Sequence, residues 1–180
     1  MPLRDTILKE SHKLFYERGF HDSGVELLSK RAGTTKRTLY AYFGNKEGLI
    51  EEVLRYRHSI FMTQLRDYFN KYEIKETADI VACYLAFLKD WTTSIAFYGC
   101  MFINACAEYS DVQSSPHQIA KQHKTEVRKW LFDSFEKINA NNAKQKSDIL
   151  FLFGEGIIVS AQTLQEFSHL DMEEIIKILN

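Results

Sequence analysis

Turn-forming residues are scarce in this sequence, which restricts the folds open to it. Only two prolines and eight glycines are spread over 180 residues. All-β sandwiches and barrels need many tight turns, which glycine and proline supply most readily. Apolar residues instead recur at intervals of three and four along most of the chain, which is the period of an amphipathic helix. We therefore expect an all-α protein with about nine helices and no strand.

Apolar spacing and stop signals predict where the helices lie. The first part of the chain is expected to form helices over residues 4–18, 23–32, 36–43 and 46–72. The rest is expected to form helices over residues 77–91, 99–109, 115–138 and 144–169, and a last one after residue 171. Ser23 with Glu26, and Asp171 with Glu174, match the capping-box pattern, and Asn45 precedes the fourth helix as a cap.

Charge is distributed unevenly along the chain. The 23 basic and 24 acidic residues give a formal net charge of -1, which taken alone argues against a nucleic-acid partner. Residues 1–46, however, carry a charge of +4, and the remaining residues carry −5. A basic segment joined to an acidic remainder is typical of a nucleic-acid-binding module. We expect a DNA-binding domain over residues 1–46 and a second, acidic domain over residues 47–180, with the boundary inside the fourth helix.

The segment 36–43 is too short to be stable as an isolated helix. On a helical wheel Leu39 and Phe43 share one side, so we expect this side to pack on the two preceding helices. The opposite side carries Thr34, Arg37 and Thr38 and stays small, polar and basic. A short helix that follows a tight turn and presents such a side has the arrangement of a helix-turn-helix that reads DNA.

Four stretches near the start of the chain resemble the DNA-binding head of the TetR family of bacterial transcriptional repressors. They are residues 4–8, 14–20, 32–43 and 45–49, with the sequences RDTIL, LFYERGF, AGTTKRTLYAYF and NKEGL. The resemblance covers residues 4–55 and implies a homodimer of all-helical subunits. In such a protein a three-helix head binds a palindromic operator, while a larger body binds a small inducer and dimerises through its last two long helices.

The resemblance also implies which residues contact double-stranded operator DNA. They are Ser23, Thr34, Thr35, Lys36, Arg37, Thr38, Tyr40, Ala41, Tyr42 and Lys46. The guanidinium of Arg37 suits bidentate contact with guanine, whereas hydroxyl groups and Lys46 suit phosphates. Three alternatives stay open: Arg37 contacts a phosphate, Tyr40 belongs partly to the core, or Lys46 is a solvated neighbour of the helix cap. Arg37 and Ala41 depart from residues common in the family, so the operator sequence is not predicted.

Aromatic and apolar residues are concentrated in the second part of the chain. We expect a mostly apolar or aromatic inducer and name as its candidate contacts Tyr84, Leu88, Trp91, Phe102, Ile103, Cys106 and Phe135. For each of these residues, a place in the ordinary core is the alternative.

One cysteine carries a second functional hypothesis. Residues 98–108 resemble a Gly-Cys-aliphatic-Asn-Glu segment from one branch of the family, in which some regulators sense electrophiles or oxidants through a cysteine. Cys100 is therefore the candidate redox sensor, and packing as a small apolar residue is its alternative. Cys83, Cys100 and Cys106 form no C-x-x-C pair, so we expect free thiols.

The end of the chain holds more apolar residues than the surface helices of a monomer need. We expect a four-helix dimer interface formed by Phe151, Phe153, Gly154, Ile157, Ile158, Ala161, Leu164, Ile175, Ile176 and Leu179. Gly154 and Gly156 lower helix propensity, which fits a close approach of two helix backbones.

The sequence shows few features that are typical of an enzyme, a membrane protein or a metal protein. The six histidines show no metal-binding spacing, and nucleophile-elbow, Walker and dinucleotide motifs are missing. We expect no catalytic residue, cofactor or metal. Charged residues in positions 4–10 stand where a signal peptide would be apolar, and no unbroken apolar run reaches the ~18 residues of a membrane span, so we expect a cytoplasmic location. A helical protein whose head binds another protein instead of DNA remains the alternative.

Overall fold

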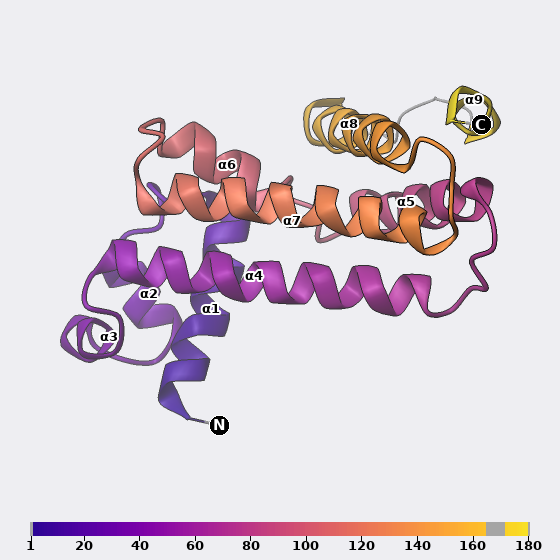
Figure 1. Ribbon diagram of the computed structural model, residues 1–180. Coiled ribbons are helices and arrows are strands. Elements are labelled where there is room, and N and C mark those ends of the chain that lie inside the picture. Colours follow the sequence, from indigo (N-terminus) through magenta and orange to yellow (C-terminus); the bar gives the residue numbers. More distant parts are fainter. Residues whose placement is uncertain (1, 165–171, 180) are drawn as a thin grey trace. The chain divides into compact units, whose positions relative to one another are not determined.

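A computed structural model describes residues 2–164 and 172–179, and every regular element in these residues is an α-helix (Figure 1). The helices are α1 (Leu3–Arg18), α2 (Val25–Arg31), α3 (Lys36–Phe43), α4 (Lys46–Phe69), α5 (Thr77–Thr92), α6 (Met101–Glu108), α7 (Ser115–Lys137), α8 (Ala143–Leu164) and α9 (Met172–Leu179). The predicted all-α fold is confirmed.

Most helix boundaries lie within a few residues of the predicted ones. The bounds of α3 are those predicted, and α7 begins at the predicted Ser115. By contrast, α6 begins at Met101 rather than at residue 99, because Gly99 has a φ of 89°, outside the helical range. Asn45 caps α4 as predicted, since its side-chain oxygen accepts a hydrogen bond from the N–H of Gly48 at 2.8 Å. The capping box predicted at Asp171 lies outside the described residues.

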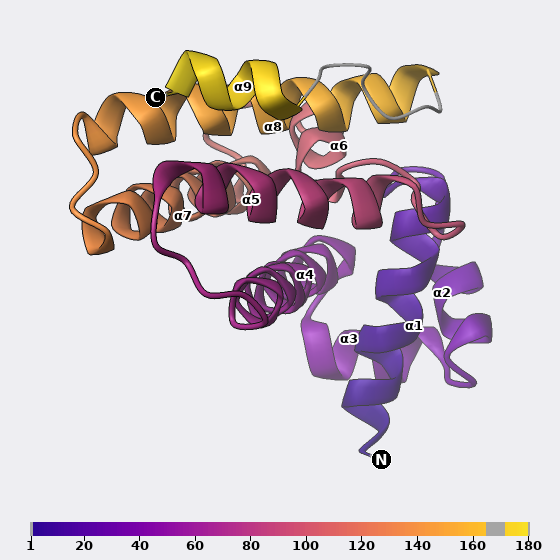
Figure 2. The same cartoon turned by 90° about the vertical axis from the view of Figure 1, so that its right-hand side faces the viewer.

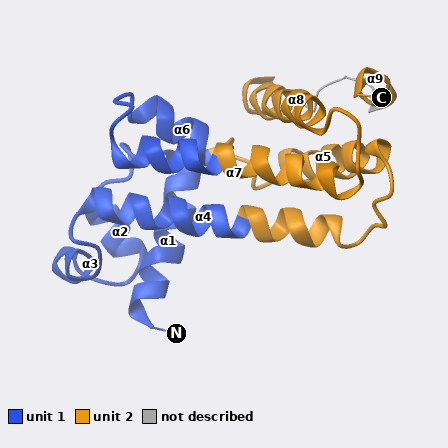
Figure 3. Cartoon of the chain, viewed as in Figure 1, with its two compact units in different colours: residues 1–60, 101–123 blue, residues 61–100, 124–180 orange. Residues whose placement is uncertain are grey.

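The chain forms two compact units, coloured separately in Figure 3. Unit 1 comprises residues 1–60 and 101–123, and unit 2 comprises residues 61–100 and 124–180. The first division falls inside α4, the helix in which the sequence placed a domain boundary. Unit 1 contains α1, α2, α3 and α6, together with the first parts of α4 and α7. The assignment of DNA binding to residues 1–46 and of ligand binding to residues 47–180 stays a prediction.

In unit 1, α2 packs against both α1 and α3. The apolar stripe of α1 buries Ile7, Leu14 and Phe15. Leu39 and Phe43 of α3 are buried as the helical wheel predicted. Their burial stabilises a helix of only two turns, which could not form in isolation.

The turn between α1 and α2 differs from the prediction. Ser23 is fully buried and donates its hydroxyl hydrogen to the carbonyl oxygen of Gly19 at 2.7 Å. Gly24 occupies the N-cap position of α2, and no side chain caps this helix. Glu26 is exposed and forms an ion pair with Lys36 at 3.6 Å. The predicted capping box of Ser23 and Glu26 is therefore wrong, because the Ser23 hydroxyl is directed at the end of α1.

Unit 2 is organised around α5, which packs against α8 and α9. Figure 2 shows α9 lying alongside α8. Tyr84 of α5 is buried against Gly154 of α8, where an added Cβ would lie 2.7 Å from the tyrosine hydroxyl oxygen. Burial raises the pKa of Tyr84, which keeps the phenol neutral. The glycine thus permits close packing of two helices within one chain.

By length and composition alone, α8 could cross a membrane, and in the described part of the chain no other helix meets that test. A third of its most apolar stretch is buried inside the protein. Core helices often have the same composition, so this property is weak support for a membrane span.

Candidate nucleic-acid interface

The turn between α2 and α3 sets where α3 begins. The N–H of Thr34 donates to the carbonyl oxygen of Ser29 at 2.9 Å, and Gly33 between them has a φ of 62°. Glycine adopts this left-handed conformation without steric cost. Thr35 then caps α3, because its hydroxyl oxygen accepts a hydrogen bond from the N–H of Thr38 at 3.2 Å.

The helix α3 has a buried side and an open side. Its buried side is formed by Leu39 and Phe43. The predicted DNA contacts on α3 and the preceding turn are exposed or half-buried: Thr34, Thr35, Lys36, Arg37, Thr38, Tyr40, Ala41 and Tyr42. The structure therefore brings most of the predicted DNA contacts together on one short helix and its first turn.

The two basic side chains of α3 have different surroundings. Lys36 forms its ion pair with Glu26 and also lies 5.7 Å from the centroid of the Tyr40 ring. Arg37 is exposed and has no ion-pair partner among the residues that the structure describes. Its guanidinium can approach DNA without first breaking an ion pair. The predicted contact of Arg37 with a base stays a prediction, and its exposed guanidinium is compatible with it.

Ser23 and Lys46 stand apart from this open surface. The hydroxyl of Ser23 is buried in the α1–α2 turn and is directed away from solvent. Lys46 is half-buried, and its Nζ donates to the carbonyl oxygen of His21 at 3.2 Å. Burial lowers the pKa of Lys46, while the carboxylates of Glu108 and Asp22 oppose that shift. In the protein without DNA, both side chains hold the turn.

Part of the positive charge of the head is neutralised locally. Arg4 of α1 pairs with Glu52 of α4 at 2.7 Å. Arg31 at the end of α2 lies 3.6 Å from carboxylate oxygens of both Glu10 and Glu17. These pairs join α1 to α2 and to α4, so neighbouring carboxylates offset part of the basic charge of the head.

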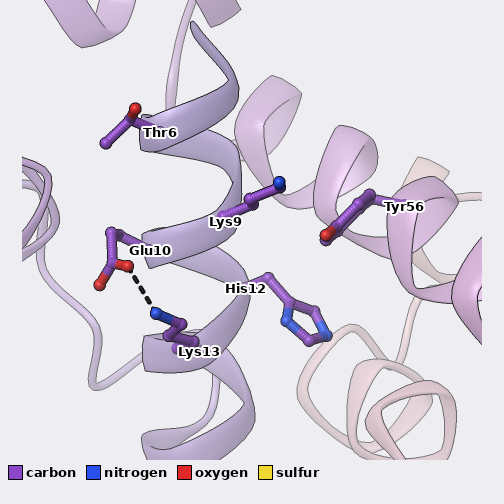
Figure 4. Close-up of a pocket in the computed structure, with 6 residues that line it drawn as sticks. All are labelled: Thr6, Lys9, Glu10, His12, Lys13 and Tyr56. Carbon is purple, nitrogen blue, oxygen red and sulfur yellow. Dashed lines mark hydrogen bonds and ion pairs between the residues drawn. The ribbon is translucent and has the colours of Figure 1, made fainter. Parts of the chain in front are cut away.

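A cavity of about 380 Å³ lies beside α1 (Figure 4). It is lined by Thr6, Lys9, Glu10, His12, Lys13 and Tyr56. The ring of His12 makes an edge contact with Tyr56, and its Nε2 is buried without a hydrogen-bond partner. Burial, followed by the charge of Arg57, lowers the pKa of His12 to about 4. Sequence reasoning missed this histidine because only the fold places α4 against it.

Comparison with known proteins identifies the head. Residues 7–53 match the family model of bacterial regulatory proteins, tetR family. The transcriptional regulator YjdC of Escherichia coli (strain K12) is 24% identical, with the alignment covering 86% of this chain and 81% of that protein. The head of this chain, over residues 7–53, belongs to the TetR family. The chain is therefore a DNA-binding transcriptional regulator.

Two further likenesses extend beyond the head. The transcriptional repressor ComR of Escherichia coli (strain K12) is 33% identical over 59% of this chain and 51% of that protein. The structure of the TetR-family regulator SCO4454 from Streptomyces coelicolor superposes with a TM-score of 0.81. That superposition covers 98% of this chain and 89% of SCO4454 at 21% identity, so it shows that the two share a fold.

The candidate inducer contacts of this chain are divided between the units. Tyr84, Leu88, Trp91 and Phe135 lie in unit 2, whereas Phe102, Ile103 and Cys106 lie on α6 in unit 1. Tyr84, Leu88, Phe102 and Phe135 are buried, and the other three are half-buried. Phe102 stacks on the ring of His123 at a centroid distance of 3.6 Å. His123 in turn lies 3.0 Å from His58, measured between their Nδ1 atoms.

Two cavities in unit 2 are lined by other residues. The larger, of about 490 Å³, lies between the end of α4 and the end of α7. Phe69 and Trp130 form its aromatic wall, with their rings edge to face at 4.6 Å, and Arg66 and Lys137 add positive charge. The smaller, of about 310 Å³, includes Cys83 among its lining residues. Sequence spacing could not reveal the larger site, because it is formed where two helices distant in the sequence end. The smaller site lies along α5 and the loop before it.

Cys100 is placed where access is poor. The residue is 2% exposed, and its backbone N–H donates to the side-chain oxygen of Gln162 on α8 at 3.0 Å. Cys83 is also buried, and Cys106 is half-buried. The described cysteines are free thiols. A buried thiol reacts slowly with oxidants, so this placement favours packing over sensing for Cys100.

The predicted dimer residues fall into two groups. Gly154, Ile157, Ile158, Ala161, Ile175 and Leu179 are buried within the chain and form part of its own core. Gly154 in particular accommodates Tyr84 of the same chain. Phe151, Phe153 and Ile176 are half-buried, and Leu164 is exposed. The structure adds three exposed apolar side chains that the sequence prediction did not include: Leu152, Val159 and Ile178. Sequence periodicity marks α8 as apolar but does not tell which side faces its own subunit.

Proposed function

We propose that this regulator is a repressor that binds a palindromic operator in the cytoplasm as a homodimer and is released by a small, mostly apolar or aromatic inducer. The observation that carries the proposal is the division of α3 into two sides. Leu39 and Phe43 fix the helix on the head, while Thr35 and Arg37 stay accessible on its first turn. That arrangement presents the start of a short helix to the major groove.

Within this proposal the residues of α3 have separate tasks. Arg37 donates two hydrogen bonds to a guanine, and Thr34, Thr35, Thr38, Tyr40 and Tyr42 contact phosphates or sugars. Ala41 leaves room for a base, and Lys36 exchanges Glu26 for a phosphate. Ser23 acts through the turn in which its side chain is buried.

The exposed apolar side chains of α8 and α9 support the homodimer. Leu152 is 67% exposed, Leu164 64% and Ile178 60%, and Val159 lies on the same helix as the first two. Large apolar side chains grouped on neighbouring helices are typical of a subunit interface. A dimer would present two copies of α3 to successive major grooves, about 34–36 Å apart.

An apolar inducer is supported by the aromatic content of the helices that follow the head. Phe102, Ile103 and Cys106 on α6, and Tyr84, Leu88, Trp91 and Phe135 in unit 2, remain the proposed contacts. The repressor role is supported by the description of ComR, a relative over half of its length, as a repressor.

Selection of DNA from a random pool by the purified protein tests DNA recognition. We expect enrichment of a palindrome, binding of one dimer to it, and weaker binding to random DNA of equal length. A reporter gene with the selected palindrome in its promoter should be repressed when the protein is expressed. No enrichment, or equal affinity for selected and random DNA, would contradict the proposal, and activation of the reporter would contradict the repressor role.

Light scattering tests the dimer. We expect the wild-type protein to have the mass of two chains at micromolar concentration and Leu152→Glu to have the mass of one. Gln145→Glu adds the same charge at an exposed polar position of α8 and serves as the matched control. A panel of aromatic and apolar small molecules then tests the inducer through release of the selected DNA. A monomeric wild type would contradict the proposed homodimer. A panel in which no molecule releases DNA would contradict the proposed inducer.

A further inference from the structure

Glu108 occupies an unfavourable place in its own helix. It is the last residue of α6, where the negative end of the helix dipole repels a carboxylate. The side chain is 22% exposed and therefore loses part of its hydration. Such a residue needs compensation from donors elsewhere in the fold.

The α1–α2 turn supplies these donors. The backbone N–H of Phe20 lies 3.0 Å from each carboxylate oxygen of Glu108, and the N–H of His21 donates to Oε2 at 2.6 Å. Successive amide groups pointing at one anion form a strong, directional site. The Nδ1 atom of His21 lies 3.2 Å from the same Oε2.

The shape of the turn fits the carboxylate closely. Gly19 has a φ of 81°, and a Cβ added to it would lie 2.9 Å from Oε1 of Glu108. Phe20 is fully buried, and its ring lies 6.2 Å from that of Tyr109, the residue after Glu108. Lys46 at the start of α4 donates to the carbonyl oxygen of His21. The turn is thus bound to α6 through its N–H groups and to α4 through a carbonyl group.

We propose that Glu108 is a positioning residue for DNA binding, which fixes the α1–α2 turn and thereby the direction of α2 and α3. This inference rests on the proposed operator binding. The turn lies close to the DNA-binding helix in the fold, because α2 begins at Val25 directly after the turn and packs against both α1 and α3. Glu108 contacts no DNA in this proposal and acts through the N–H groups of Phe20 and His21.

Electrostatics alone predicts the opposite effect. A carboxylate near a DNA-binding surface repels phosphate, so its removal should strengthen binding if charge were its only influence. Glu26 provides the matched comparison, because it is an exposed acid that forms an ion pair with Lys36 and has no role in the α1–α2 turn bonds described above. Removal of Glu26 should leave DNA affinity unchanged or raise it, whereas removal of Glu108 should lower it.

The test measures binding of the full chain to its selected DNA by fluorescence anisotropy over a series of salt concentrations. We expect Glu108→Ala to weaken binding by about tenfold or more and to make the salt dependence shallower, because a misdirected head loses phosphate contacts. Glu108→Gln keeps one acceptor oxygen and should restore part of the affinity. Hydrogen exchange at the amides of Phe20 and His21 should accelerate in Glu108→Ala and less in Glu108→Gln.

Three results would overturn the proposal. The first is Glu108→Ala binding as tightly as Glu26→Gln with an unchanged salt slope. The second is a loss of affinity in Glu108→Ala that is fully explained by its fraction of unfolded protein. In that result the salt dependence is unchanged, and Glu108→Gln restores none of the affinity. The third is wild-type protein that binds no DNA, which would remove the proposed function as well, whereas the first two leave operator binding intact.

Discussion

Replacement of Arg37 tests whether α3 reads bases. Arg37 is exposed on the first turn of α3, and the described residues offer it no ion-pair partner. Arg37→Ala should therefore leave the free energy of unfolding within about 0.5 kcal/mol of wild type. Two hydrogen bonds to a guanine contribute about 1–3 kcal/mol for each half-site, so the affinity for selected DNA should fall by about 5- to 150-fold per half-site.

Arg37→Lys separates base contact from phosphate contact. Lysine keeps the charge but lacks the planar fork that binds guanine bidentately. We expect it to retain most of the affinity for random DNA and to lose the preference for one base pair in each half-site. Anisotropy titrations on selected DNA, on DNA changed at single positions and on random DNA measure both effects.

Equal weakening on selected and random DNA by Arg37→Ala would refute the base contact. In that case the slope of log affinity against log salt concentration should become shallower by about 0.9 for each lost phosphate contact. That change is expected of a residue that binds phosphate only. Full base preference in Arg37→Lys would refute the bidentate geometry.

Two further substitutions test the packing of each unit. His12 has a folded-state pKa of about 4, below its ordinary value of 6.5, so the unfolded chain takes up the proton first as pH falls. The free energy of unfolding should therefore be highest above pH 6.5 and should decline by up to about 3 kcal/mol by pH 4, as measured by urea unfolding. His12→Phe lacks the titrating group, so an equally steep decline in this variant would contradict the prediction. Gly154→Ala places a methyl group against the buried Tyr84, and this overlap should outweigh the gain in helix propensity and lower stability by about 1–2 kcal/mol. Thermal unfolding measures the change, and a variant as stable as wild type would show that α5 and α8 can separate.

Local patterns of the sequence predicted the reading head well. The bounds of α3 and the Asn45 cap follow from contacts between residues that are close in the chain, and the helical wheel indicated which side of α3 is buried. Such contacts depend on helical period and on side-chain chemistry alone, and both are visible in the sequence. The failed capping box at Ser23 is the informative exception. Its hydroxyl bonds Gly19 instead, a choice between two nearby partners that spacing does not decide.

Only the tertiary structure shows which residues distant in the sequence contact each other. Glu108 reads as an ordinary polar residue at a helix end, yet it binds Phe20 and His21, more than eighty positions earlier. Gly154 was expected in a dimer interface, and the fold places Tyr84 against it. In both cases the sequence gives the chemistry of a residue but not what lies opposite it, since that depends on how helices pack.

The sequence by itself therefore determined that the chain is helical, that its charge is concentrated in a head, and that this head resembles those of TetR regulators. Only the tertiary structure decided which side of α8 stays exposed, why His12 remains neutral, and how Glu108 and Lys46 hold one turn from two directions. Helical period and charge are properties of neighbouring residues. Burial, pKa and long-range hydrogen bonds are set by helices that meet only in the folded chain.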